Sequence, residues 1–332
     1  MSSNIIEMPV SPALSDSQGY YPHGGGVESA ASNWQCHVAD ILDLSTGLHP
    51  AGPPKWLKAW MAEHVSLAGH YPEIHGEPAR SRLAEEFGVS PEQVLITAGA
   101  QAVIEVIFHA MKWQSMAICV PCYSEPIRCA KRSGCRVHTI EAGDRFPAVD
   151  AWWWTSPNNP FGNAEAFPEG LSGVLDESYM SFTERRTAKV IPDVIRLGSL
   201  TKTFCIPGLR LGYVIADVAT IQTLKAWLPP WPASTLALHL LPELLPEADK
   251  RDAQIAVTRQ RLTRLLTKQG WDCYPSQASF VLARPAATVP DFSVQKILVR
   301  EFPEWPQLKG WIRFGLPGDE AEWQRLEETL CL

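Results

Sequence analysis

The chain has 332 residues, of which 45% are hydrophobic and 20% charged, and its net charge is −7. This balance is typical of a globular protein, and no Lys/Arg run offsets the negative charge, so nucleic-acid binding is disfavoured. No apolar run reaches the roughly 18–20 residues of a membrane span, and the N-terminus lacks the basic and apolar regions of a secretion signal. We therefore expect a cytoplasmic protein, and the length suggests two domains.

Short apolar runs alternate with stretches of helical spacing along most of the chain. Residues 1–35 are rich in Gly, Ser and Pro and predict an arm rather than a core element. The expected strands are 94–97, 116–120, 135–140, 151–154, 173–176, 194–199 and 209–216, and the expected helices between them are 79–87, 99–111 and 124–134. This alternation predicts an α/β fold with a mostly parallel central sheet covered by helices.

The pattern changes after about residue 217. Long helices are expected over 220–228 and 235–269, followed by short strands around 279–283 and 311–315. We therefore predict a large domain over 46–228 and a smaller α+β domain over 229–332. The first 45 residues are assigned to the arm and to part of the small domain.

The eight cysteines are scattered, which is typical of reduced thiols in a cytosolic protein rather than of a disulfide framework. Cys119 and Cys122 form a CxxC motif, which is compatible with redox or zinc chemistry. The alternative is a structural role, in which two small residues flank Pro121 at a strand end. No second CxxC or His pair follows at ligand spacing. We predict no metal site.

Polar and aromatic residues follow five of the expected strands. They are TAGAQ after 94–97, Tyr123 after 116–120, SPNNPFG after 151–154, Asp176 and Tyr179 at the end of GVLD, and Lys202 after VIRLGS. Ligands of open α/β sheets bind at the carboxyl ends of the strands, so these residues predict one site.

The residue types at these strand ends indicate a particular chemistry. The turn at 98–101 opens a helix whose free N–H groups suit a phosphate, and the hydroxyls of Ser199 and Thr201 and the Arg210 guanidinium suit the same anion. Lys202 is a candidate nucleophilic amine, and Asp176 is a carboxylate suited to a protonated heterocyclic nitrogen. Together these groups meet the needs of pyridoxal 5′-phosphate (PLP).

Three motifs resemble those of fold-type I PLP enzymes, the aspartate-aminotransferase superfamily. SLTKTFCIPGLRLGY resembles the family's lysine motif, SPNNPFG its Asn-Pro-x-Gly turn, and LDESYMSF its Asp-x-x-Tyr motif. The order of the motifs also agrees with that of the family, so the chain is identified as a member.

The resemblance implies a role for each matching residue. Lys202 would carry the cofactor, Asp176 would keep its ring nitrogen protonated, and Tyr123 would stack on the ring. The ring hydroxyl would be contacted by Asn159 and Tyr179, and the phosphate by Ala100, Gln101, Ser199, Thr201 and Arg210. Tyr71, in HYPEIHG, resembles a tyrosine that reaches the neighbouring subunit's cofactor, which implies a homodimer.

Within the superfamily the chain is most similar to the branch of histidinol-phosphate aminotransferase and the threonine-phosphate decarboxylase of cobalamin biosynthesis. HGGG at 23–26, LDLSTGLHPAGPP at 42–54 and SEPIRCAKRSGC at 124–135 resemble the decarboxylase, although Leu48-His49 stands where Asn is common. The resemblance implies that His23, Arg128, Asn159 and Arg313 bind substrate, Arg313 through the α-carboxylate. Each of three of these residues has an alternative role. His23 could cap the arm, Arg128 could be a surface charge, and Arg313 could pair with a core acid.

The implied reaction is decarboxylation of L-threonine O-3-phosphate to (R)-1-amino-2-propanol O-2-phosphate. A histidinol-phosphate-type aminotransferase is the alternative on the same fold, because the two reactions differ only in which bond to Cα is aligned for cleavage. A non-catalytic PLP-binding effector module is a third hypothesis. It is disfavoured because 35 N-terminal residues are too short for a helix-turn-helix domain.

Overall fold

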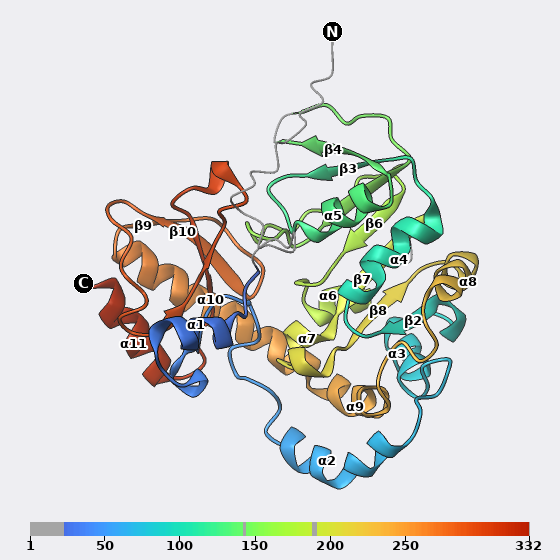
Figure 1. The fold of residues 1–332 in the computed structure, drawn as a ribbon, viewed down its shortest axis with the longest axis horizontal. Coiled ribbons are helices and arrows are strands. Elements are labelled where there is room, and N and C mark those ends of the chain that lie inside the picture. Colours follow the sequence, from blue (N-terminus) through green and yellow to red (C-terminus); the bar gives the residue numbers. More distant parts are fainter. Residues whose placement is uncertain (1–22, 142–143, 188–190, 332) are drawn as a thin grey trace.

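The computed structural model describes residues 23–141, 144–187 and 191–331. Its centre is a seven-stranded sheet (Figure 1). In spatial order the strands are β2 (Val94–Thr97), β8 (Gly212–Ile215), β7 (Val194–Ser199), β6 (Gly173–Asp176), β5 (Ala151–Thr155), β3 (Ser115–Cys119) and β4 (Arg136–Ile140). Only the two pairs made by β8 are antiparallel within this sheet, so the predicted mostly parallel sheet is confirmed.

Helices cover both faces of this sheet, because each central strand is apolar on both sides. On β2, Leu95 faces one cluster while Val94 and Ile96 face the other. The helices over the first face are α4 (Gln101–Met111), α5 (Glu125–Arg132) and α8 (Val218–Trp227). Those over the second include α3 (Ala79–Phe87), α6 (Phe182–Thr187) and α9 (Thr235–Leu244).

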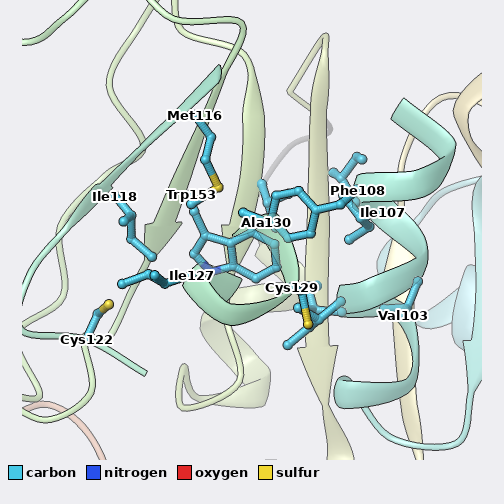
Figure 2. Close-up of a cluster of buried hydrophobic side chains, with 14 of the residues drawn as sticks. Val103, Ile107, Phe108, Met116, Ile118, Cys122, Ile127, Cys129, Ala130 and Trp153 are labelled. Atoms are coloured by element: carbon cyan, nitrogen blue, oxygen red, sulfur yellow. The ribbon is translucent and has the colours of Figure 1, made fainter. Parts of the chain in front are cut away.

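The core beneath α4 and α5 is built around a tryptophan. Trp153 of β5 lies between the two helices and stacks on Phe108 at 5.9 Å between ring centroids (Figure 2). Trp152 and Trp154 point to the opposite face, where they join a smaller apolar cluster. The run of three tryptophans therefore packs both faces of one buried strand.

A second, smaller part of the molecule lies beside the large sheet (Figure 1). It contains an antiparallel sheet with the order β12 (Arg300–Glu301), β13 (Ile312–Gly315), β10 (Phe280–Pro285) and β9 (Trp271–Cys273). Helices α10 (Ala248–Lys268) and α11 (Glu320–Leu330) pack on this sheet through leucines and Trp323. The parallel pair β1 (Leu42–Asp43) and β11 (Ile297–Leu298) brings the N-terminal segment to this part.

Two elements differ from the prediction. The helix expected over 235–269 is broken into α9 and α10 by a 3₁₀ turn, Leu245–Glu247, because Pro246 has no N–H to donate to residue 242. The arm predicted over 1–35 contains α1 (Val27–Trp34), whose Ala30 and Ala31 are buried; residues 1–22 lie outside the described residues.

Besides α1, four helices were not expected: α2 (Leu57–His64), α6, α7 (Leu200–Thr203) and α11. Helix α9 packs with α3, β2 and β8 rather than with the small sheet. The domain boundary at residue 229 stays a prediction, and this packing favours a boundary in α10.

Candidate functional site

A cavity of about 270 Å³ lies where the carboxyl ends of the parallel strands face the small sheet. The large sheet supplies Thr155, Asp176 and Ser199, and the turns after its strands supply most of the remaining polar groups. Arg300 and Arg313 enter from the small sheet, and His23 and Gly24 from the N-terminal segment. The cavity is thus enclosed by three parts of the chain that are distant in sequence.

One end of the cavity is an anion cradle, formed by the turn between β2 and α4 together with Arg210. The first N–H groups of an α-helix have no intrahelical acceptor, and α4 begins at this end of the cavity. A Cβ on Gly99 would lie 2.6 Å from Arg210 Nη2, so only glycine lets the guanidinium pack against this turn, and its φ of +77° also favours glycine. Ser199 and Thr201 add two buried hydroxyls 2.7 Å apart.

Lys202 lies next to this cradle, on the short helix α7 that follows β7. Its Nζ is 5.2 Å from the centre of the Tyr179 ring. Burial acts to raise the pKa of Tyr179, but the positive charges of Lys202 and Arg313 outweigh it, so the pKa lies below its ordinary value. The Tyr179 hydroxyl donates to the Thr46 carbonyl at 3.2 Å.

Asp176, at the end of β6, is a buried carboxylate without an ion-pair partner among the described residues. Its Oδ1 accepts from Ser178 N at 3.0 Å and Ser178 Oγ at 2.6 Å. Burial raises the pKa of this carboxyl despite the Ser178 hydrogen bonds and the charge of Lys202. A buried acid with so few partners suits a cationic group in the cavity.

Tyr123 and Gln101 form one wall, and a buried carboxylate stands behind them. The Tyr123 hydroxyl donates to Gln101 Oε1 at 2.9 Å, and Gln101 Nε2 donates to Glu125 Oε2 at 3.3 Å. Glu125 Oε1 also lies 3.1 Å from His23 Nε2, and Arg128 Nε donates to Glu125 Oε2 at 2.8 Å. Burial opposes ionisation of Glu125, but the bonds from His23 and Arg128 prevail and lower its pKa to about 2.

Two arginines approach from the small sheet, where Arg300 and Arg313 are cross-strand partners. Arg313 donates to Asn159 Oδ1 and to the Ser45 carbonyl, each at 2.5 Å, while its Nε is buried without a partner. Arg300 donates to Glu304, whose second oxygen is also buried without a partner. Two guanidinium groups that line one side of the cavity suit an anionic substrate.

The structure brings most of the predicted site residues to this one cavity. Those that line it are His23, Ala100, Gln101, Tyr123, Asn159, Asp176, Tyr179, Ser199, Thr201, Lys202, Arg210 and Arg313. Two do not line it. Arg128 is turned to Glu125, and Tyr71 is 79% exposed with its ring 4.5 Å from that of Trp231.

Sequence reasoning missed Arg300, Glu304 and Glu125. Arg300 and Glu304 stand outside any expected element, and their proximity to Arg313 depends on the register of β12 and β13. Glu125 was visible in SEPIRCAKRSGC as the first residue after Ser124, but nothing in that pattern showed that it is buried.

The CxxC cysteines lie outside this chemistry. Burial raises the pKa of Cys122, and burial together with the charge of Glu165 raises that of Cys119, so both thiols are poor nucleophiles. All eight cysteines are free. In the described ranges, no three His, Cys, Asp or Glu side chains gather as metal ligands, and no helix is long and apolar enough to cross a membrane.

The family model "Aminotransferase class I and II" matches residues 39–152 and 165–330, which contain the small sheet, most of the large sheet and most of the residues that line the cavity. The chain belongs to the aminotransferase class I and II family. Its predicted membership and its fold class are thereby confirmed, including the small C-terminal α+β part.

Curated relatives in this family carry two activities. The threonine-phosphate decarboxylase of Pseudomonas aeruginosa is 28% identical over 93% of this chain and 96% of its own length. The histidinol-phosphate aminotransferase of Cronobacter sakazakii is 29% identical over 78% of this chain and 82% of its own length. The match to the decarboxylase thus extends over more of the chain.

Solved structures share the fold of this family member. The L-threonine-O-3-phosphate decarboxylase from Porphyromonas gingivalis has a TM-score of 0.76 at 23% identity and covers 87% of this chain and 98% of its own. The histidinol-phosphate aminotransferase from Sinorhizobium meliloti, solved with pyridoxal-5′-phosphate, has a TM-score of 0.80 at 20% identity and covers 99% and 98%. At these identities the likeness describes the fold.

Proposed function

We propose that this class I and II aminotransferase family member is a PLP-dependent carboxy-lyase that decarboxylates L-threonine O-3-phosphate. The donor set of the cavity fits PLP. The turn at Gly99 and Arg210 would hold its phosphate, Asp176 would accept a hydrogen bond from its protonated ring nitrogen, and Lys202 would be its covalent attachment point. When bound, PLP supplies an electron sink for bonds to the substrate Cα.

Substrate recognition falls to the residues around the rest of the cavity. L-threonine O-3-phosphate carries two anionic groups, a carboxylate and a phosphate. Arg313 is the proposed carboxylate ligand, because it lines the cavity and its guanidinium is permanently charged. His23 and Arg300 line the cavity as further cationic candidates for the phosphate.

In the proposed reaction the bond between Cα and the carboxylate breaks, carbon dioxide leaves, and a proton from solvent takes its place on Cα. The side chains orient the substrate so that this bond, rather than the Cα–H bond, is cleaved. The Nζ of Lys202 is the group that we expect to deliver the proton, because it is the amine beside Tyr179 and the cradle.

One observation favours the decarboxylase over the aminotransferase. The N-terminal segment reaches the cavity, where His23 pairs with Glu125 beside Tyr123, and its Gly24 packs so closely on Ser45 that a Cβ would lie 2.3 Å from the Ser45 carbonyl oxygen. This HGGG segment is one of the three stretches of the chain that resemble the decarboxylase. Histidinol-phosphate aminotransferase activity is the second candidate, because relatives with that name match most of the chain.

We also propose a homodimer that works in the cytoplasm, as part of cobalamin biosynthesis. Tyr71 supports the dimer, since a 79% exposed tyrosine beside the exposed Trp231 is available to a second copy of the chain. The eight free cysteines support a reducing compartment. Sedimentation of the wild type and Tyr71→Ala tests the dimer.

The activity test is a product assay on protein loaded with PLP and supplied with L-threonine O-3-phosphate. We expect carbon dioxide and aminopropanol phosphate in equal amounts, and neither from Lys202→Ala. Amino-group transfer from histidinol phosphate to 2-oxoglutarate, without carbon dioxide from threonine phosphate, would replace this proposal with the aminotransferase.

A further inference from the structure

A buried group of charged residues lies behind Asp176, on the side away from the cavity. Arg185 is fully buried, and Arg196 and Glu177 are each 1% exposed. None of the three lines the cavity. Arg196 Nε donates to Glu177 Oε2 at 3.0 Å and its Nη2 to Glu177 Oε1 at 3.3 Å, so these two form an ion pair.

Arg185 has no ion-pair partner among the described residues, and its Nε is buried without a hydrogen bond. Its remaining donors bind two carbonyl oxygens and one hydroxyl: Nη1 to Glu177 O and Ser199 O, and Nη2 to Thr203 Oγ1, each at 3.2 Å. Burying a guanidinium without a carboxylate is expensive, and arginine cannot escape the cost by losing its proton.

The positions of these acceptors are informative. Glu177 directly follows Asp176 at the end of β6, and Ser199 ends β7 just before Lys202. Arg185 therefore links the ends of the two strands that carry the cavity's carboxylate and amine. Thr203, the third acceptor, directly follows Lys202.

The charged groups around Asp176 also connect Arg185 with the cavity. Besides the Ser178 hydrogen bonds, the positive groups that favour the ionised form of Asp176 are Lys202 and Arg185. In the proposed function, on which this inference rests, Lys202 is occupied by the cofactor. Arg185 then remains as a permanent positive charge near Asp176, whereas the charge of Arg196 is paired with Glu177.

We propose that Arg185 is a positioning residue for the cofactor site: it ties the end of β6, beside Asp176, to the end of β7, and it places a permanent positive charge behind the Asp176 carboxylate. Asp176 can then accept a hydrogen bond from a cationic ring nitrogen. Arg185 itself contacts neither the cavity nor its contents.

The test is a double-mutant cycle on the full-length protein, read out as PLP affinity through quenching of intrinsic tryptophan fluorescence. We expect Arg185→Met to weaken PLP binding by about tenfold or more, as for the loss of a buried compensating charge. In the Asp176→Asn background the same substitution is expected to weaken it by at most about threefold, because the effect on the Asp176 carboxylate is gone and only the loss of strand positioning remains. Equal weakening in both backgrounds would overturn the proposal.

Two further variants keep the test decisive if Arg185→Met does not fold. Arg185→Lys keeps the charge and is expected to bind PLP within about fivefold of the wild type. Thr203→Val removes one acceptor, keeps the charge, and is expected to change affinity by less than about threefold. If Arg185→Lys binds PLP as weakly as Asp176→Asn, the inference fails. If the wild type itself does not bind PLP, the proposed function fails instead.

Discussion

We expect the buried side chain of His49 to make the free energy of unfolding depend on pH between about pH 6.5 and pH 4. This residue is 2% exposed. Its Nδ1 accepts from Ala51 N–H at 3.1 Å, so the proton is on Nε2, which donates to the Arg251 carbonyl at 3.0 Å. Its backbone N–H donates to the Lys202 carbonyl at 3.1 Å, which ties this loop to the proposed attachment point of the cofactor.

Burial lowers the pKa of His49 from 6.5 to about 4, with the charge of Arg251 acting in the same direction and the Arg251 carbonyl and Asp252 opposing. The unfolded chain therefore takes up a proton before the folded one does. The contribution of neutral His49 to the free energy of unfolding is fully present above about pH 6.5 and is lost as the pH falls toward 4. With each pKa unit worth about 1.4 kcal/mol, the loss is about 2 kcal/mol between pH 8 and pH 5.

The assay is urea unfolding of the cofactor-free wild type and His49→Asn at pH 8 and pH 5. We expect the variant to be less stable at pH 8 by about 1 kcal/mol, because the bond to the Arg251 carbonyl is lost. Between pH 8 and pH 5 the wild type should lose about 2 kcal/mol more than the variant, since other titrating groups contribute equally to both. An identical pH dependence in the two proteins would refute the reasoning.

Two further predictions concern the walls of the cavity. Gly99→Ala places a Cβ 2.6 Å from Arg210 Nη2 and should weaken PLP binding by about tenfold, measured by fluorescence titration. Gly88→Ala, at a φ of +64° with open space around it, is the control and should leave affinity unchanged. Glu125→Gln should lower the free energy of unfolding by about 3 kcal/mol at pH 7. This difference should disappear as the pH falls from about 4.5 to about 2, because the Glu125 carboxylate of the wild type is then protonated in both the folded and the unfolded state. Glu105→Gln, which breaks an exposed ion pair, should change stability by at most about 0.5 kcal/mol in the same urea titrations.

The sequence was sufficient for the seven strands of the large sheet and for the groups at their ends. Asp176 and Lys202 follow continuous apolar runs, so the parallel sheet alone places them at one edge. Pro246 also indicated the break between α9 and α10, but the helical spacing of apolar residues on either side favoured one continuous helix.

The charged residues behind and opposite the cavity could not be predicted in the same way. Arg185 and Glu125 lie on helices among other charged residues, where the pattern alone indicates a solvated face. Arg300 meets the cavity only through strand pairing between distant segments. The burial of such groups depends on tertiary packing, which local sequence does not encode.

The fate of the hydrogen on the substrate Cα distinguishes the proposed reaction most directly. We would incubate the PLP-loaded protein with L-threonine O-3-phosphate in deuterium oxide and follow both compounds by NMR. The account predicts aminopropanol phosphate with one deuterium on the former Cα, while the remaining substrate keeps its α-hydrogen. Exchange of the substrate's α-hydrogen for deuterium, with the carboxylate retained, would contradict it and indicate the proton chemistry of an aminotransferase.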